Sequence, residues 1–175
     1  MGWIRYCEKL IKNYRSEVIQ DKTMEKFSLN IDQIAQYLEI IPPFLMIDYV
    51  KEIIPGKSAQ GVKILTANDW FFKCHMQRES VMPGTLQIEA LLQTLVLTIY
   101  TMKGHKGKFS YISNISTKLI SKVSPGNQFV IHADLLSYKR GIAKGVAVGK
   151  INDAKVCQGE FTFISPHDIP RPEAN

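Results

Sequence analysis

His75 and Glu89 are the two titratable side chains whose surroundings indicate chemistry. His75 lies upstream of a Met-Pro-Gly turn at 82–84, and Glu89 interrupts an apolar run that predicts a buried helix. An unpaired carboxylate is costly to bury, so Glu89 must pair, take up a proton or face a cavity. Taken alone, it could equally be a partly exposed acid near a helix N-terminus, where negative charge is favoured. A histidine is the side chain that most often acts as a general base, so His75 together with Glu89 favours acid–base chemistry.

The element that must position Glu89 is a helix running from Gly84 to about Met102. Pro83 precedes it and Gly104 closes it, which are typical start and stop signals. Its apolar side chains cover nearly every face, which is typical of a buried helix; they are Leu86, Ile88, Ala90, Leu91, Leu92, Leu95, Val96, Leu97 and Ile99.

Strands are predicted on both sides of this helix. Segments 44–53 and 59–66 are rich in apolar residues and are separated by a Pro-Gly turn. Segments 108–120, 127–138, 141–151 and 154–164 are rich in β-branched and aromatic residues, with turn residues between them, which predicts an antiparallel meander. The fold class is therefore α+β, with an antiparallel sheet that wraps one long helix.

The flanking segments divide the chain into three parts. Residues 3–18 have apolar side chains at helical spacing and predict an amphipathic helix, packed on the domain, on a partner subunit, or on a membrane surface. A second helix is expected over 31–40, capped by Asn30 with Gln33 three residues on. We expect an N-terminal helical extension at 1–30, a main domain at 31–165 and a proline-rich tail at 166–175.

Composition narrows the class of protein. The 175 residues are 45% hydrophobic, and Cys7, Cys74 and Cys157 form no CxxC pair, so neither a disulfide framework nor a zinc site is indicated. The N-terminus has no apolar signal segment, and no apolar run is long enough to span a bilayer. No nucleic-acid-reading motif is present. A cytoplasmic location is expected.

The charge distribution is uneven. The net charge is +6, and no acidic residue occurs between Glu89 and Asp134, a stretch that holds several lysines. This pattern predicts either a basic face that attracts an acidic partner or a solvated lysine face without one.

The residues around His75 carry a resemblance to a known family. His75, the segment VMPG at 81–84, and Glu89-Ala90 with Gln93 keep the order and spacing of a motif in the hotdog-fold 3-hydroxyacyl-acyl-carrier-protein dehydratases of the FabZ and FabA types. The likeness includes PFLMIDYV at 43–50, NDWFFKCH at 68–75 and the last strands, so it covers about residues 31–165. The chain resembles a divergent member with an N-terminal extension.

The resemblance implies a hotdog fold and the loss of water from a (3R)-3-hydroxyacyl thioester to give a trans-2-enoyl thioester. His75 is then the base that takes a C2 proton, and Glu89 is the acid that protonates the departing hydroxyl. A backbone N–H at Gly84 would stabilise the thioester carbonyl. The substrate-binding residues implied are Gly84, Met82, Pro83, Gln93 and Phe72, and no metal or cofactor is expected.

The resemblance also implies partners. The family's substrates are attached as thioesters to acidic acyl carrier proteins, in fatty-acid or polyketide and polyene-type biosynthesis. Lys139, Arg140, Lys118 and Lys122 are the candidate carrier-binding residues. Each active site of the family lies at a dimer interface, with the histidine from one chain and the acid from the other. A homodimer or a trimer of dimers is therefore expected.

The sequence departs from the family after the histidine. Met76 and Gln77 stand where the family has Phe and Pro, and Pro42 stands near a tyrosine that gates the acyl tunnel. Three other functions therefore stay open: an enoyl isomerase, a thioesterase of the same fold, and a non-catalytic acyl-binding subunit.

Overall fold

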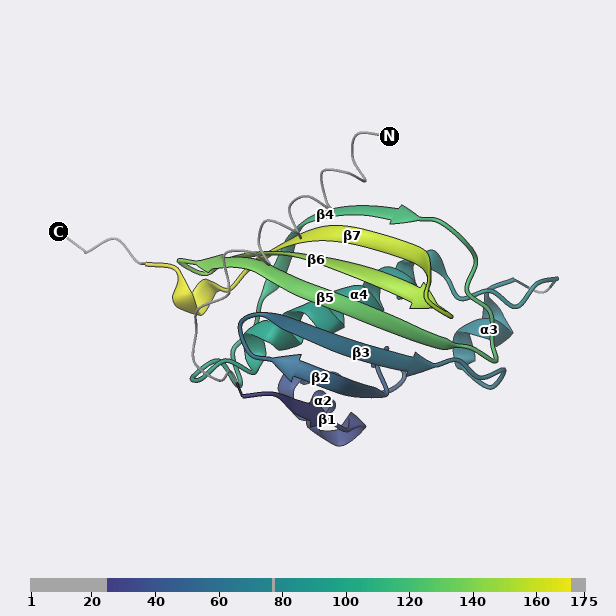
Figure 1. Ribbon diagram of the computed structural model, residues 1–175, viewed down its shortest axis with the longest axis horizontal. Helices are drawn as coiled ribbons and strands as arrows, with labels where there is room; N and C mark the ends of the chain where they lie inside the picture. Colours follow the sequence, from purple (N-terminus) through teal and green to yellow (C-terminus); the bar gives the residue numbers. More distant parts are fainter. Residues whose placement is uncertain (1–24, 77, 171–175) are drawn as a thin grey trace.

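The computed structural model describes residues 25–76 and 78–170. One seven-stranded sheet of order β1-β2-β3-β5-β6-β7-β4 curls around the helix α4 (Figure 1), which is the arrangement of a hotdog fold. Every neighbouring pair of strands is antiparallel. The elements are β1 (Phe27–Leu29), α2 (Ile31–Leu38), β2 (Tyr49–Ile54), β3 (Ser58–Ile64), α3 (Trp70–Cys74), α4 (Gly84–Tyr100), β4 (Tyr111–Leu119), β5 (Gln128–Lys139), β6 (Ile142–Ile151), β7 (Ala154–Ile164) and the short 3-10 helix η1 (Pro166–Asp168).

Helix α4 is buried because two glycines let it approach the sheet closely. A Cβ added at Gly61 in β3 would lie 2.6 Å from Thr94 Oγ1, and one at Gly145 in β6 would lie 2.7 Å from Leu95 Cδ1. Leu91, Leu95 and their neighbours on the helix are fully buried in the core. The prediction of a buried apolar helix that starts at Gly84 is confirmed.

The predicted strands are present, but the expected order of a simple meander is wrong. Of the four strands in the predicted meander, only β5, β6 and β7 lie side by side in chain order, joined by two-residue turns at Arg140-Gly141 and Asn152-Asp153. Both residues of each turn have positive φ, which matches the twist of paired strands. Strand β4 instead pairs with β7 at the sheet edge, and residues 120–127 carry the chain across to β5. Because this connection is longer than a tight turn, β4 does not have to pair with β5, the next strand in the sequence.

The N-terminal part of the domain differs from expectation in three places. The strand expected over 44–53 begins only at Tyr49, because the backbone of Phe44 and Met46 bonds to the Gln93 side chain instead. The short elements β1 and α3 were not predicted, and β1 lies in the segment assigned to the N-terminal extension. The helix expected over 3–18 lies outside the described residues.

The predicted cap of the second helix is confirmed. The Asn30 side chain accepts a hydrogen bond from the Gln33 backbone N–H, and the Gln33 side chain accepts one from the Asn30 N–H, each at 2.9 Å. In the described ranges 25–76 and 78–170, no helix is long and apolar enough to cross a membrane.

Candidate active site

His75 is held by a backbone carbonyl six residues further along the chain. It follows α3 directly, and its Nδ1 lies 2.9 Å from the carbonyl oxygen of Val81. A carbonyl oxygen only accepts, so Nδ1 carries the proton and donates. In the neutral ring, Nε2 therefore keeps its lone pair and can accept a proton. The side chain is exposed, which leaves this nitrogen accessible.

An ion-pair cluster positions the segment that leads to His75. Lys63 Nζ lies 2.8 Å from an oxygen of Asp48 and 3.4 Å from an oxygen of Asp69, the residue that precedes α3. The Trp70 indole N–H also donates to the Pro43 carbonyl at 3.1 Å. The lysine is 9% exposed, so this cluster fixes α3 to β3 and the 43–48 segment from a largely buried position.

Within the described part of the chain, the N-terminus of α4 has no side-chain cap, and its first turn contains no acidic residue. The free backbone N–H groups and the positive end of the helix dipole therefore favour a negatively charged oxygen in front of Gly84. A Cβ at Gly84 would lie 2.3 Å from Leu119 Cδ1, so Leu119 covers this glycine.

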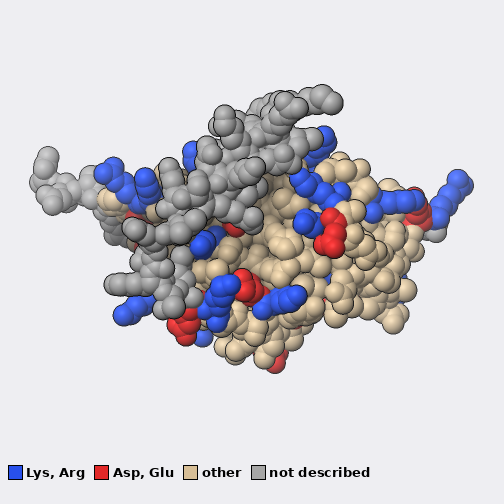
Figure 2. Space-filling model, in the orientation of Figure 1, with Lys and Arg blue, Asp and Glu red and all other residues tan. Residues whose placement is uncertain are grey.

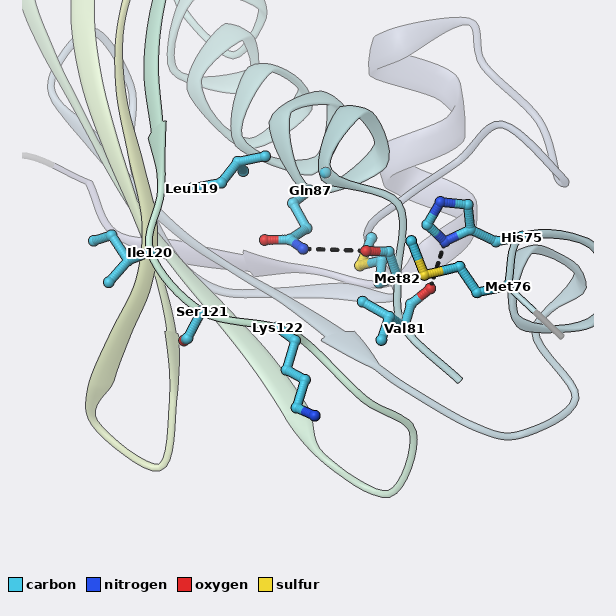
Figure 3. A pocket seen from close by; sticks show the side chains of 10 residues that line it. His75, Met76, Val81, Met82, Gln87, Leu119, Ile120, Ser121 and Lys122 are labelled. Carbon is cyan, nitrogen blue, oxygen red and sulfur yellow. Dashed lines mark hydrogen bonds between the residues drawn. The ribbon is translucent and has the colours of Figure 1, made fainter. Parts of the chain in front are cut away.

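His75 and Gly84 line one open pocket of about 470 Å³ (Figure 3). Its walls are the loop after α3, the first turn of α4 and the segment after β4. The complete lining is His75, Met76, Val81, Met82, Gly84, Gln87, Leu119, Ile120, Ser121 and Lys122. The expected substrate-binding residues Gly84 and Met82 are thus brought together with the histidine.

The other expected substrate-binding residues do not line this pocket. Phe72 is buried in the core. The amide of Gln93 is occupied: it accepts from the Met46 N–H at 2.8 Å and donates to the Phe44 carbonyl and to Glu89, each at 2.9 Å. Pro83 precedes the helix and lies at its start. Gln93 therefore holds the expected acid in place.

Glu89 lies on a different face of α4 from the pocket. At about 100° per residue, its side chain projects about 200° around the helix from that of Gln87, which lines the pocket. Burial raises the pKa of the Glu89 carboxyl, and the hydrogen bond from Gln93 lowers it by less. A raised pKa suits a proton donor. Within one protomer, however, Glu89 is not part of the pocket that contains His75.

The four candidate carrier-binding residues fall into two groups. Lys122 lines the pocket and pairs with Glu79, while Lys118 lies in the neighbouring strand β4. Lys139 and Arg140 lie at the far end of β5, which is about 36 Å long. Basic side chains are spread over the face in Figure 2, with acidic ones between them, so no single patch dominates that face.

Sequence reasoning missed Gln87. Its side chain is 3% exposed, it lines the pocket, and its Nε2 donates to the Met82 carbonyl at 3.2 Å. The signal was available, because Gln87, Glu89 and Gln93 are the amides and acid in an otherwise mostly apolar helix. Buried polar groups in such a helix need hydrogen-bond partners, and that requirement alone identifies Gln87 as a candidate site residue.

Comparisons with known proteins identify the family of this chain. The family model described as the FabA-like domain matches residues 41–160. The 3-hydroxyacyl-[acyl-carrier-protein] dehydratase FabZ of Caldicellulosiruptor bescii is 39% identical over 77% of this chain and 96% of its own length. The corresponding FabZ of Syntrophomonas wolfei is 35% identical over 80% of this chain and 98% of its own.

Solved structures agree on the fold. A chain of the dehydratase heterocomplex ApeI:P from Xenorhabdus doucetiae superposes with a TM-score of 0.64 at 11% identity, covering 76% of this chain and 90% of its own. A sigma28-regulated virulence protein from Campylobacter jejuni gives a TM-score of 0.61 at 15% identity, covering 79% of this chain and 98% of its own. These structures show the hotdog fold, while the family model and the curated relatives show that the chain belongs to the FabA-like family, as a FabZ-type dehydratase.

Proposed function

We propose that the protein removes water from a (3R)-3-hydroxyacyl thioester on acyl carrier protein and gives the trans-2-enoyl thioester, in fatty-acid or polyketide-type biosynthesis. The observation that carries the proposal is the His75–Val81 hydrogen bond, which leaves Nε2 as a base in the same pocket as the uncapped N-terminus of α4. The curated relatives bear the name of this reaction, at up to 39% identity.

The reaction needs a base, an oxyanion partner and an acid. His75 Nε2 takes the C2 proton, and the N–H groups at the start of α4 stabilise the charge that develops on the thioester oxygen. Glu89, whose pKa is raised by burial, protonates the C3 hydroxyl so that it leaves as water. The step balances: the C2–H electron pair forms the new double bond, and the C3–O electron pair leaves with the hydroxyl, which takes a proton from Glu89 and departs as water. The C2 proton ends on His75, and its return to Glu89 through solvent restores both side chains.

A second protomer would complete the site. Within one protomer Glu89 faces away from the pocket, so the acid that serves His75 comes from a partner chain in this proposal. All nine residues of the edge strand β4 are exposed, including Tyr111, Ile112 and Ile115. Unpaired edges with apolar side chains favour pairing with another chain. This supports a homodimer, alone or as the unit of a trimer of dimers.

Carrier recognition is proposed for the basic residues next to the pocket. Lys122 lines the pocket, and Lys118 precedes the pocket residue Leu119 at the end of β4. Both lysines can therefore attract an acidic carrier to the thioester site. Lys139 and Arg140 lie at the other end of β5 and would serve the same role only for a carrier bound there.

One assay separates the proposed reaction from the alternatives. The purified protein is incubated with a 3-hydroxyacyl and an enoyl thioester, and water loss, free thiol and double-bond position are followed. Interconversion of the two thioesters without thiol release is expected. Thiol release would favour a thioesterase, a moved double bond an isomerase, and no conversion a binding subunit. His75→Ala should lower turnover by at least about 100-fold.

A further inference from the structure

Gln87 contains a buried oxygen that lacks a partner. Its Oε1 makes no hydrogen bond to any residue in the described ranges 25–76 and 78–170. The Met82 carbonyl can only accept, so the nitrogen of the amide must face Met82 and the oxygen must face the other way. In Figure 3 that oxygen points from α4 into the space beside Ile120. A buried acceptor without a donor is costly, which points to a donor supplied from outside the protomer.

The position of this oxygen relative to the proposed chemistry limits the donor. Gln87 lies one helical turn after Gly84, on the same side of α4, and both line the pocket with His75. A thioester whose carbonyl oxygen meets the helix N-terminus has its C3 hydroxyl three bonds from the carbonyl carbon. That hydroxyl is the one hydrogen-bond donor in the simple 3-hydroxyacyl part of the substrate.

A hydroxyl that leaves as water needs an acceptor for its own hydrogen. The general acid must reach a lone pair on the hydroxyl oxygen, while the hydroxyl hydrogen must be directed elsewhere. If that hydrogen pointed at His75 Nε2, it would occupy the base needed for the C2 proton. An acceptor on α4 removes this competition.

We propose that Gln87 Oε1 accepts a hydrogen bond from the C3 hydroxyl of the substrate, so that Gln87 orients the leaving group and selects hydroxylated acyl chains. This inference rests on the proposed dehydratase function. Leu119, which is half exposed and covers Gly84, is the flexible side chain that turns aside when the thioester enters. The bond to Met82 keeps the amide in the required orientation.

The test compares a hydroxylated and a saturated ligand. Gln87→Met has nearly the same shape but no amide, and Gln87→Leu is a second variant in case the first folds poorly. The two measurements are kcat/KM for a 3-hydroxyacyl pantetheine thioester and the inhibition constant of the saturated acyl pantetheine thioester of equal length. We expect kcat/KM to fall about tenfold or more, with the inhibition constant changed less than about twofold.

Thr98→Val is the matched control, because it removes a buried polar group of α4 that bonds to the Leu95 carbonyl away from the pocket. It should change neither measurement. Equal changes in both measurements for the Gln87 variants, or none in either, would overturn the role of Gln87 while leaving the dehydratase function intact. A wild-type protein that forms no enoyl product would overturn both.

Discussion

The carboxylate of Glu89 accepts a hydrogen bond of 2.9 Å from the side-chain amide of Gln93, one turn further along α4. The same amide is anchored to the backbone of Phe44 and Met46. Glu89 is thus held rigidly at a half-buried position whose desolvation raises its pKa. The arrangement keeps a proton donor in place at the cost of a carboxylate that is poorly solvated when charged.

Glu89→Gln should be inactive and more stable than the wild type at high pH. Because the Glu89 pKa is raised on folding, its contribution to stability is complete below the ordinary value of 4.5 and is lost as pH rises through the raised value. Glutamine does not titrate and can still accept from Gln93. The melting-temperature gain should therefore be near zero at acid pH and positive at pH 8, as measured by scanning calorimetry.

The exposed acid Glu52 on β2 provides the matched variant for that experiment. A gain at pH 8 that is equally large for Glu52→Gln, or a variant Glu89→Gln that melts below the wild type at pH 8, would contradict the burial argument. Turnover by Glu89→Gln should fall about 100-fold or more.

Mixing two inactive variants should restore activity if the site is shared between protomers. A heterodimer of His75→Ala and Glu89→Gln contains one site with both residues intact and one with neither. With random pairing, about one quarter of wild-type activity is expected, because about half of the dimers are mixed and each has one working site. Turnover is measured after subunit exchange. No recovery, with exchange shown by differently tagged chains, would place both residues in one protomer's site.

Gly84→Ala should separate activity from stability. The added methyl would collide with Leu119, but that side chain is half exposed and can rotate away. The substitution should therefore lower the free energy of unfolding by less than about 1 kcal/mol. The methyl and the displaced leucine crowd the helix N-terminus, so kcat/KM should fall at least about tenfold. Urea unfolding and steady-state kinetics measure the two effects.

Gly145→Ala is the contrasting variant. Its Cβ would lie 2.7 Å from Leu95 and 2.9 Å from the Asp134 backbone oxygen, neither of which can move freely in the core. We expect a loss of about 1–3 kcal/mol in stability with unchanged kcat per folded molecule. If Gly84→Ala behaved like Gly145→Ala, its glycine would serve packing rather than substrate access.

Charge reversal should identify the carrier-binding surface. Lys122→Glu should raise the KM for a carrier-bound substrate several-fold and leave that for a pantetheine-bound substrate unchanged, because only the carrier is a large anion. The effect should shrink at high salt. Lys139→Glu, at the far end of β5, tests the alternative surface under the same assay. If only Lys139→Glu raised the KM for the carrier-bound substrate, the carrier would bind at that end of β5 instead.

The loss of the Lys122–Glu79 ion pair must be separated from the loss of carrier binding. Glu79→Gln removes the same pair while leaving Lys122 positive, so it should not raise the KM for the carrier-bound substrate. A rise equal to that of Lys122→Glu would show that the ion pair shapes the pocket.

The sequence was most informative where local signals and burial agree. The Asn30 cap, the start of α4 at Gly84 and the two-residue turn at Asn152 depend on nearby residues, and all are found where expected. The start of β2 was misplaced because Gln93, distant in sequence, takes the backbone bonds of 44–46. Long-range partners of this kind leave no local pattern.

The site could be predicted only in part for the same reason. The spacing of His75 and Glu89 identified both residues. That Glu89 lies on a face of α4 away from the pocket that contains His75 depends on how this helix packs against the loop after α3. The role of Gln87 depends on the Met82 carbonyl, a backbone group that any residue could provide.

The pairing of β4 with β7 has a consequence for synthesis on the ribosome. Strand β4 leaves the ribosome soon after α4, yet its partner is the last strand of the domain. The wall of the pocket at Leu119–Lys122 can therefore close only after Val156 and Cys157 have emerged, because Leu119 pairs with Cys157 and the Ile120 N–H donates to the Val156 carbonyl. Until then the nascent chain carries a strand without a partner that includes Tyr111, Ile112 and Ile115, so a chaperone that shields residues 111–120 during translation should raise the yield of folded protein.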